Sequence, residues 1–474
     1  MLFNSVEFAI YLPIVFTLYW YAFNRKVKSR NIFIISCSYL FYGMWDWRFL
    51  SLIIISSLAD YIIGLRIYSN DNSKHRKTLL LISILINIGI LGFFKYFNFF
   101  TDSFLTLFNV LGISLSYERM NIILPVGISF YTFQTLSYTL DIYRKKLEPT
   151  KDITAFFAFV SFFPQLVAGP IERAKDLLPQ FYKTTEATYK TIRSGLILIT
   201  IGLFKKIVIA DRLAIYIDSC YGNIGDAHGL PLLIAVIFFA FQLYLDFSAY
   251  SDIAIGIAKT LGFNLSTNFN SPYLSTSFSD FWKRWHISLS SWFKDYVYIS
   301  LGGNKVSKNK IIRNILIVFL LSGLWHGASW NFVIWGALNG LFLVILDKYI
   351  IKLFKLNLFK HIFIFFSWAF SLIFFRAQSF SEAIYIFKNI SLSNKDEIYN
   401  MGLNSSELNF TFWLLLGYMI IEYLNERKGS LTSKITEHNT YIRMLFYILL
   451  VLSIIFLGKY GVDFNDTSFI YFQF

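Results

Sequence analysis

The stretch Leu320-Leu-Ser-Gly-Leu-Trp-His-Gly-Ala-Ser-Trp-Asn-Phe-Val-Ile-Trp335 is among the most apolar in the chain, yet it carries a histidine, His326, with no acidic residue on either side. A segment of this length and composition can enter a bilayer, where hydrocarbon penalises an unpaired polar group. His326 is therefore expected either to make a structural hydrogen bond or to take part in proton chemistry or a substrate pathway. Both interpretations are open from the local sequence alone.

The composition of the whole chain agrees with a membrane environment. Hydrophobic residues make up 56% and charged residues 15% of 474 positions, and the chain holds 53 Phe, 30 Tyr and 11 Trp, well beyond a soluble globular average. The long apolar runs fall at residues 6–23, 32–44, 49–67, 79–94, 196–210, 230–245, 331–346, 362–375, 410–421 and 444–457. We therefore predict an all-α, polytopic integral membrane protein with about eleven membrane-embedded helices and, in addition, interfacial or re-entrant helices.

The basic residues predict how the chain is oriented. A formal net charge of +14 would suggest nucleic acid as a partner for a soluble protein, but here the basic residues occupy short loops between apolar runs. Clusters at residues 25–30, 74–77 and 144–146 follow the positive-inside pattern and are expected on the cytoplasmic side. This arrangement places the N-terminus outside, requires no nucleic acid, and makes the first apolar run a retained helix instead of a signal peptide.

The chemistry available to the chain is limited. No Cys/His/acidic spacing typical of a metal site, no glycine-rich phosphate loop and no nucleophile elbow occurs in the sequence. We therefore expect no metal, and any reaction must use histidine, hydroxyl and carboxylate groups.

A second histidine lies in Ser277-Phe-Ser-Asp-Phe-Trp-Lys-Arg-Trp-His-Ile-Ser-Leu-Ser-Ser-Trp-Phe-Lys-Asp-Tyr296. On a helical wheel the aromatic residues gather on one face and the charged residues and serines on the other, which predicts one amphipathic helix over residues 277–296. His286 falls at the edge of the apolar face, so that it reaches both the interior and a polar cavity. The alternative is an interfacial anchor in which this histidine is incidental.

A third polar group lies in the run that follows residue 230. Gln242, Asp246 and Tyr250 recur every four residues and so share one helix face. A carboxylate in such a segment should face the protein interior or water. The group is expected to form a hydrogen-bond network between helices, or else to orient a histidine or line a channel.

Together these motifs resemble the membrane-bound O-acyltransferase (MBOAT) family, and in particular its bacterial alginate O-acetylation branch. The resemblance is carried by the segment from Phe281 through Leu301-Gly-Gly-Asn304 and by Ser322-Gly-Leu-Trp-His-Gly327. Further matches are Met1-Leu-Phe-Asn-Ser5, Leu124-Pro-Val-Gly-Ile-Ser-Phe130, Phe162-Phe-Pro-Gln-Leu-Val-Ala-Gly-Pro170, Asp246 to Phe263, and Phe469-Ile-Tyr-Phe-Gln-Phe474.

The resemblance implies a single membrane domain over residues 1–474, with a core at about residues 120–345, in which helices surround a central tunnel. It implies that His326 is the catalytic histidine and that His286 is a second active-site residue. A buried, neutral imidazole can take the proton of a hydroxyl that attacks a thioester carbonyl, while His286 orients the donor or stabilises the oxyanion. Candidates for substrate binding or tunnel lining are Trp285, Asp246, Tyr250, Trp325 and Asn331. Packing would explain Trp325 and Asn331 at least as well, and a structural hydrogen-bond network would explain Asp246 and Tyr250.

The function that the resemblance implies is O-acyl transfer, with acetyl as the expected group, in the bacterial cytoplasmic (inner) membrane. The donor is a cytoplasmic thioester such as acetyl-CoA, with no bound cofactor, and the acceptor is a cell-envelope or exported polysaccharide. The expected partners are membrane lipid and a periplasmic or extracellular acetyltransferase of the SGNH-hydrolase type. One alternative is a teichoic-acid D-alanyl transferase that uses an acyl carrier protein, and another is a polysaccharide or lipid transporter or flippase.

Overall fold

The computed structural model describes residues 1–115, 117–186, 188–222, 224–460 and 469–470. Residues 471–474 of the terminal motif lie outside this part of the chain. Within it, all regular secondary structure is helical, apart from one isolated bridge between Gly229 and Ile390. The predicted all-α class is confirmed.

Seven helical segments of the described chain are long and apolar enough to cross a membrane, which confirms the polytopic class. They are Val6–Phe23, Val27–Tyr68, Ser73–Val110, Leu230–Thr260, Trp330–Leu353, Asn357–Arg376 and Thr440–Leu457. Two of these segments contain 42 and 38 residues, about twice what one crossing needs. Because they include helix breaks and other helices are shorter, the expected number of about eleven embedded helices stays a prediction.

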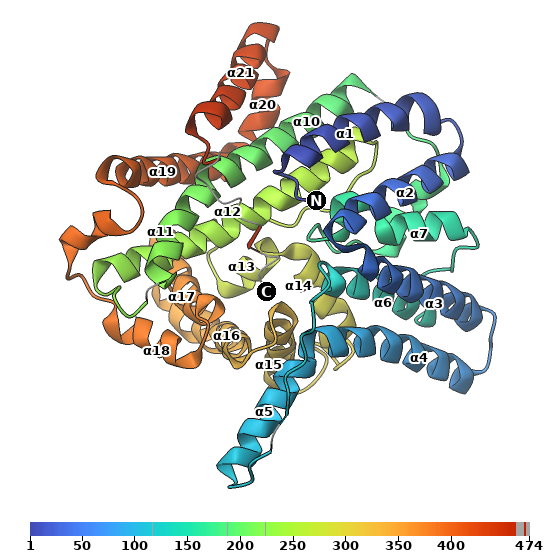
Figure 1. The fold of residues 1–474 in the computed structure, drawn as a ribbon, viewed down its shortest axis with the longest axis horizontal. Helices are drawn as coiled ribbons and strands as arrows, with labels where there is room; N and C mark the ends of the chain where they lie inside the picture. The colour runs from blue at the N-terminus through green and yellow to red at the C-terminus, as the bar shows by residue number, and fades with distance from the viewer. Residues whose placement is uncertain (116, 187, 223, 461–468, 471–474) are drawn as a thin grey trace. The chain divides into compact units, whose positions relative to one another are not determined.

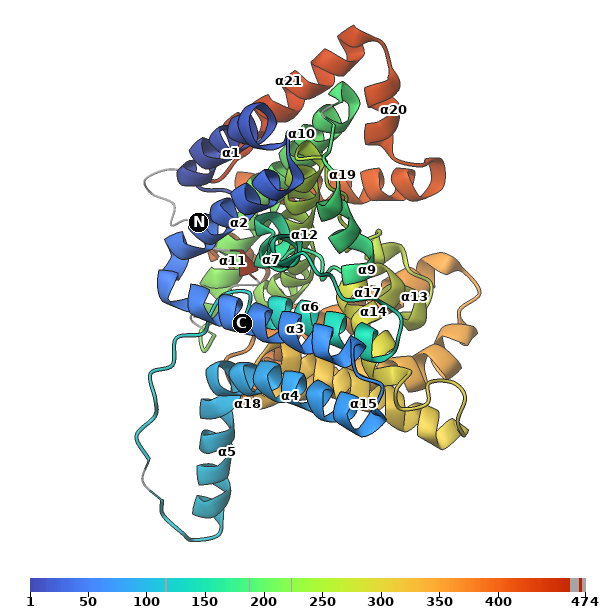
Figure 2. The same ribbon diagram turned by 90° about the vertical axis from the view of Figure 1, so that its right-hand side faces the viewer.

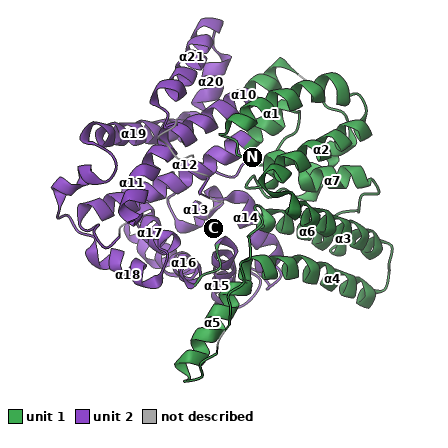
Figure 3. Cartoon of the chain, in the orientation of Figure 1, with its two compact units in different colours: residues 1–195, 254–266, 327–329 green, residues 196–253, 267–326, 330–474 purple. Residues whose placement is uncertain are grey.

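The chain forms two compact units (Figure 3). Unit 1 comprises residues 1–195, 254–266 and 327–329, and unit 2 comprises residues 196–253, 267–326 and 330–474. With η denoting 3-10 and π-helical segments, the helices that begin in unit 1 are α1 (Val6–Leu18), η1 (Tyr19–Phe23), α2 (Val27–Asp46), η2 (Trp47–Phe49), α3 (Leu50–Tyr68), α4 (Ser73–Leu91), η3 (Gly92–Tyr96), α5 (Phe97–Val110), α6 (Ile128–Tyr143), α7 (Ile153–Ser161), α8 (Phe163–Leu166), α9 (Ala174–Leu177), η4 (Leu178–Tyr182) and α10 (Tyr189–Leu203).

Unit 1 is held together by a buried polar network between α3, α4 and α6. The Asp60 carboxylate accepts hydrogen bonds from Ser83 Oγ at 2.5 Å and from Asn87 Nδ2 at 2.8 Å, and the Asn87 amide oxygen accepts from Thr135 Oγ1 at 3.1 Å. In hydrocarbon such groups must find partners within the protein. By contrast α5 buries no residue and extends away from the neighbouring helices of its unit (Figures 1 and 2).

Unit 2 contains the segments that the motifs singled out. Its helices are η5 (Phe204–Ala210), α11 (Asp211–Gly222), α12 (Leu230–Thr260, up to Ile253), η6 (Pro272–Leu274), α13 (Phe278–Arg284), α14 (Ile287–Phe293), η7 (Lys294–Tyr298), α15 (Lys308–His326), α16 (Trp330–Leu341), η8 (Phe342–Ile350), η9 (Ile351–Leu353), α17 (Asn357–Arg376), α18 (Phe380–Asn389), η10 (Lys395–Asn400), α19 (Ser405–Lys428), α20 (Leu431–Glu437) and α21 (Thr440–Leu457). The prediction that Gln242, Asp246 and Tyr250 share one helix is confirmed, since α12 runs unbroken for 31 residues.

Two glycines bring α15 and α16 into direct backbone contact. A Cβ atom on Gly323 would lie 2.2 Å from the carbonyl oxygen of Phe332, and one on Gly336 would lie 2.3 Å from that of Phe319. Neither position has room for a larger residue. Small residues allow this approach where two membrane helices must pack tightly, and here it fixes the end of α15, which is His326.

The prediction of one helix over residues 277–296 is wrong. The chain forms α13 and α14, with Trp285 in extended conformation and His286 in the left-handed region at φ 43° and ψ 55°. Helical periodicity continues through the break because both short helices bury aromatic residues. The break itself is stabilised by tertiary contacts: Asn268 O accepts a hydrogen bond from Ile287 N at 2.9 Å, and Asn270 N donates to Arg284 O at 3.0 Å.

Candidate active site

The structure brings the two motif histidines together inside unit 2. The ring centroids of His286 and His326 are 6.4 Å apart, and both side chains are buried. His286 stands at the break between α13 and α14, whereas His326 is the last residue of α15. Two imidazoles from segments forty residues apart therefore share one small volume.

Asn268 positions His286 and sets its tautomer. The Asn268 side-chain oxygen accepts hydrogen bonds from Ser288 N at 3.2 Å and Ser288 Oγ at 2.9 Å, and it lies 3.1 Å from His286 Nδ1. Because an amide oxygen only accepts, Nδ1 must donate, and Nε2 is then the acceptor nitrogen of the neutral ring. Burial lowers the pKa of His286 from 6.5 to about 3, so the ring stays neutral at physiological pH.

Aromatic rings surround His326. Its ring centroid lies 5.0 Å from that of Trp325, 5.1 Å from that of Trp335 and 5.4 Å from that of Phe375, all in edge-to-face orientation. These rings pack closely around the imidazole and bury it.

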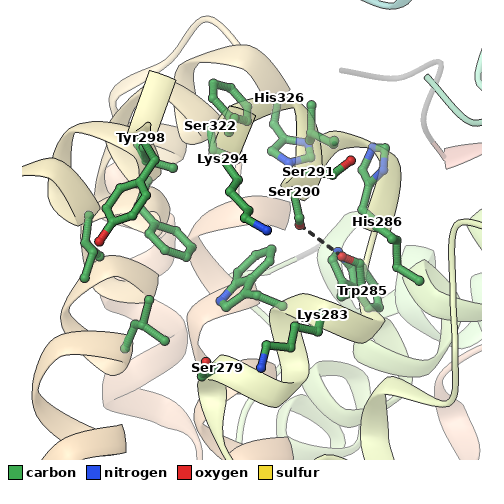
Figure 4. A pocket seen from close by; sticks show the side chains of 18 residues that line it. Ser279, Lys283, Trp285, His286, Ser290, Ser291, Lys294, Tyr298, Ser322 and His326 are labelled. Carbon is green, nitrogen blue, oxygen red and sulfur yellow. Dashed lines mark hydrogen bonds between the residues drawn. The ribbon is translucent and has the colours of Figure 1, made fainter. Parts of the chain in front are cut away.

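Both histidines line a pocket of about 410 Å³, which we call the histidine pocket (Figure 4). All its lining residues belong to unit 2, from α13, the break at Trp285 and His286, α14, η7, α15 and η8. The α15 residues that line it are Ile315, Val318, Phe319, Ser322 and His326, and their spacing places them along one face of that helix. From Ile315 to His326 this face is about 16 Å long. The pocket is thus a slot with the two imidazoles at one end.

Asp246 does not line the histidine pocket. Its Oδ1 lies 2.7 Å from Lys206 Nζ, and the same ammonium lies 2.9 Å from Asp211 Oδ1. The second Asp246 oxygen accepts a hydrogen bond from Ile470 N at 2.7 Å. Lys206, Asp211 and Asp246, which we call the lysine–aspartate cluster, are all buried and are mutually paired.

The other predicted site residues occupy different environments. Trp285 lines the histidine pocket, whereas Trp325 packs against both histidines. Asn331 donates from its side chain to Ala377 O at 2.9 Å, and the ring of Tyr250 lies 5.0 Å from that of Phe469. A role in substrate binding or tunnel lining remains a prediction for all five candidates, and the pocket directly supports it only for Trp285.

Sequence reasoning missed Asn268 and Lys206. Asn268 lies in an irregular segment without periodicity, and nothing local marks it. For Lys206 there was a signal, since Lys205 and Lys206 interrupt the apolar run at residues 196–210, and a charge in such a run needs a buried partner.

Comparison with known proteins places this site in context. Residues 144–387 match the model of the MBOAT, membrane-bound O-acyltransferase family. The chain is 37% identical to the probable alginate O-acetylase of Pseudomonas aeruginosa over 90% of its length and 83% of that protein's length. It is 35% identical to the peptidoglycan O-acetyltransferase of Helicobacter pylori over 86% of its length and 83% of that protein's. The chain is 30% identical to the teichoic acid D-alanyltransferase of Bacillus subtilis over 46% of its length and 57% of that protein's length.

Proposed function

This chain belongs to the membrane-bound O-acyltransferase family, and on that premise we propose that it is an O-acetyltransferase acting on a cell-envelope or exported polysaccharide. The observation that carries the proposal is the pair of buried imidazoles at one end of the histidine pocket. An enzyme that joins a hydroxyl to an acyl thioester needs a base beside a water-poor slot that admits the donor.

In the proposed reaction His326 is the general base. It accepts the proton of the acceptor hydroxyl as that oxygen attacks the thioester carbonyl carbon. The tetrahedral intermediate then collapses, the carbon–sulfur bond breaks, and the proton passes from the imidazolium to the leaving thiolate. The products are an O-acyl ester and a free thiol, so that no covalent enzyme intermediate or metal is needed.

His286 is assigned a positioning role. With Nδ1 donating to Asn268, its Nε2 accepts a hydrogen bond, and the low pKa disfavours the protonated ring that oxyanion stabilisation through Nε2 would require. Of the two roles expected for this residue, orientation of the donor is therefore favoured.

Acetyl is the proposed acyl group, and acetyl-CoA or another acyl thioester is the proposed donor. The rings of Trp325, Trp335 and Phe375 lie within 5.4 Å of the His326 ring, centroid to centroid, and such close packing favours a small acyl group. A D-alanyl group delivered by an acyl carrier protein is the alternative, supported by the similarity over 46% of the chain.

We further propose one membrane domain over residues 1–474 in the bacterial cytoplasmic membrane, because the family match at 144–387 takes in residues of both units. The N-terminus is placed outside by the basic clusters. The histidine pocket would form part of a tunnel, and an SGNH-hydrolase-type partner outside would receive the acetyl group for the polysaccharide.

The test is acetyl transfer by the purified chain in detergent, together with polysaccharide acetylation in cells that carry His326→Ala at equal membrane levels. Loss of acetylation is expected. Undiminished acetylation would contradict the assignment of His326. A transporter moves its substrate between two compartments, and detergent solution has only one. A transporter would therefore show no acetyl transfer in detergent, whereas an enzyme would.

A further inference from the structure

A second cavity, within unit 1, is lined by charged side chains of both signs. It has a volume of about 340 Å³ and lies where α3 ends, α4 begins and α6 ends. We call it the mixed-charge pocket. The charged residues that line it are Asp71, Arg76, Lys145, Lys146 and Glu148.

These three cations and two carboxylates do not neutralise one another. In the part of the chain that the structure describes, none of the five side chains forms an ion pair with another or with any further charged residue. Charges of opposite sign that surround a cavity separately suit a ligand that carries both a negative and a positive group.

Arg76 is held at the pocket by its contacts with Tyr143. Its Nη2 donates to Tyr143 O at 2.8 Å, and its guanidinium carbon lies 5.6 Å from the centre of the Tyr143 ring. The Nε group of the same guanidinium is buried and has no hydrogen-bond partner among the described residues. A buried N–H group gains free energy when a ligand supplies an acceptor. A phosphate oxygen would be such an acceptor, because arginine binds phosphate strongly.

Lys145 occupies a backbone conformation that favours glycine. It follows the end of α6 with φ 58°. Lys145 N donates to Ile142 O at 3.0 Å and Lys146 N to Asp141 O at 2.8 Å, a turn in which glycine is the usual residue at the left-handed position. A lysine there adopts a strained backbone, which is typical of a side chain retained for its charge.

The pocket lies at the end of two apolar helices that expose side chains suited to lipid. Leu58 and Ile62 on α3 and Leu81 and Leu85 on α4 are exposed, and both helices run from the pocket into segments long enough to cross a membrane. The pocket also takes in residues of the basic clusters at 74–77 and 144–146, which the positive-inside pattern assigns to the cytoplasmic surface. This is the depth of the phospholipid headgroups.

We propose that the mixed-charge pocket binds the headgroup of a zwitterionic phospholipid that has a primary ammonium, of the phosphatidylethanolamine type, from the cytoplasmic leaflet. The phosphate accepts hydrogen bonds from Arg76, Lys145 and Lys146. The ammonium donates to Asp71 and Glu148. The acyl chains lie along the exposed apolar residues of α3 and α4.

The charges of the pocket select this headgroup over two other kinds. An anionic phospholipid without an ammonium would leave both carboxylates without a cation. A choline headgroup has a positive charge but no N–H group, so it cannot donate hydrogen bonds to the carboxylates. The proposal does not depend on the proposed function, because none of these five residues lines the histidine pocket.

The test is lipid binding to the purified full chain in detergent, measured by native mass spectrometry. The probes are dioleoyl phosphatidylethanolamine, phosphatidylcholine and phosphatidylglycerol, together with soluble glycerophosphoethanolamine. Wild-type protein should bind phosphatidylethanolamine about tenfold to a hundredfold more tightly than phosphatidylcholine, the range of one or two charge-assisted hydrogen bonds. Glycerophosphoethanolamine should bind more weakly than the lipid with the same headgroup, because it has no acyl chains.

Two double variants separate the two halves of the headgroup. Asp71→Asn/Glu148→Gln removes both carboxylates, so the preference for phosphatidylethanolamine over phosphatidylcholine should disappear and the affinity for phosphatidylglycerol should rise. Lys145→Asn/Lys146→Gln removes two cations and should weaken the binding of all three lipids. Asparagine tolerates the left-handed backbone at residue 145, so the thermal unfolding midpoint should stay nearly the same.

The matched control is Lys74→Gln/Lys77→Gln. It removes two charges from the first turns of α4 outside the pocket lining and should leave the order of the lipid affinities unchanged. Equal binding of phosphatidylethanolamine and phosphatidylcholine by the wild-type protein would overturn the proposal, as would a preference that survives Asp71→Asn/Glu148→Gln. Glycerophosphoethanolamine that binds as tightly as the lipid would show that the ligand is a soluble phosphate compound, which contradicts a lipid site.

Discussion

The histidine pocket and the lysine–aspartate cluster are both buried polar sites in unit 2, but they satisfy their polar groups in opposite ways. In the cluster, Lys206 lies 2.9 Å or less from the carboxylates of Asp211 and Asp246, and Ile470 N donates to the remaining Asp246 oxygen. In the pocket, His286 and His326 face each other at 6.4 Å within aromatic walls, and an open cavity of about 410 Å³ adjoins them.

Burial of a polar residue therefore does not by itself indicate function. The attraction of one ammonium to two carboxylates can hold η5, α11 and α12 together without any ligand. Two buried imidazoles that line one cavity are typical of groups retained for chemistry. The comparison therefore predicts that substitutions in the pocket change activity and those in the cluster change stability.

The largest effect is expected for His326→Gln. Glutamine retains a polar side chain of similar length but is not a base, so kcat should fall by about a hundredfold to ten-thousandfold, with the thermal unfolding midpoint nearly unchanged. Acetyl transfer and thermal unfolding of the same purified protein measure both. If the variant instead lost much of its stability, and its activity fell only in proportion to the amount of folded protein, the pocket and the cluster would not differ in this respect.

Lys206→Met is expected to give the opposite result. It leaves two buried carboxylates without their cation, and breaking a buried ion pair in this way costs about 3–5 kcal/mol. The protein should reach the membrane at a reduced level, and the folded fraction should retain its KM for the donor.

The triple variant Lys206→Met/Asp211→Asn/Asp246→Asn, which removes all three charges, should recover part of the stability. If Lys206→Met instead lowered kcat at normal stability, the cluster would belong to the site, as the sequence had predicted for Asp246.

The sequence predicts those features of the two regions that arise between residues close together along the chain, and it misses those that depend on distant residues. Composition and apolar runs predict the membrane class, and four-residue spacing predicts that Asp246 and Tyr250 share α12, because both are local patterns. The break at Trp285 and His286 depends on hydrogen bonds to Asn268 and Asn270, which lie more than ten residues away along the chain, and helical periodicity carries no information about them. For the same reason neither the pairing of Lys206 with Asp246 nor the meeting of the two histidines follows from spacing, although the family resemblance implied the latter.

A third prediction concerns the helix pair that carries His326. Gly323→Ala places a methyl group where a Cβ would lie 2.2 Å from Phe332 O, so α15 must move away from α16 at a cost of about 1–3 kcal/mol. Because His326 is three residues further along α15, kcat should fall together with stability. Gly89→Ala, at a helical glycine whose Cβ meets nothing within 4 Å, is the matched control. Unchanged activity in Gly323→Ala would mean that the α15–α16 contact does not position the base.

Asn268→Ala tests how the two histidines differ in their support. It removes the acceptor that holds His286 Nδ1, so the ring can adopt the other tautomer, and a buried donor left without its partner costs about 1–3 kcal/mol. If His286 orients the donor, the loss should appear mainly in KM for the thioester. A loss confined to kcat would assign His286 to the chemical step and contradict its proposed role.

The smallest effect is a pH dependence of stability that arises from His286. Its pKa is about 3 in the folded protein, against 6.5 for the free side chain, so below pH 6.5 the unfolded state takes up a proton that the folded state does not bind. Stability from this residue is therefore complete above pH 6.5 and is lost as the pH falls toward 3. Between pH 7 and pH 5 the thermal unfolding midpoint of the wild-type protein should fall by about 2 °C more than that of His286→Asn. The shift is small because a given change in the free energy of unfolding moves the midpoint less in a longer chain.

Asparagine is the matched substitution because it tolerates the left-handed backbone at this position. Equal pH dependence in the two proteins would mean that His286 is accessible to protons in the folded state, and the contrast between a neutral His286 and an ion-paired cluster would then no longer hold.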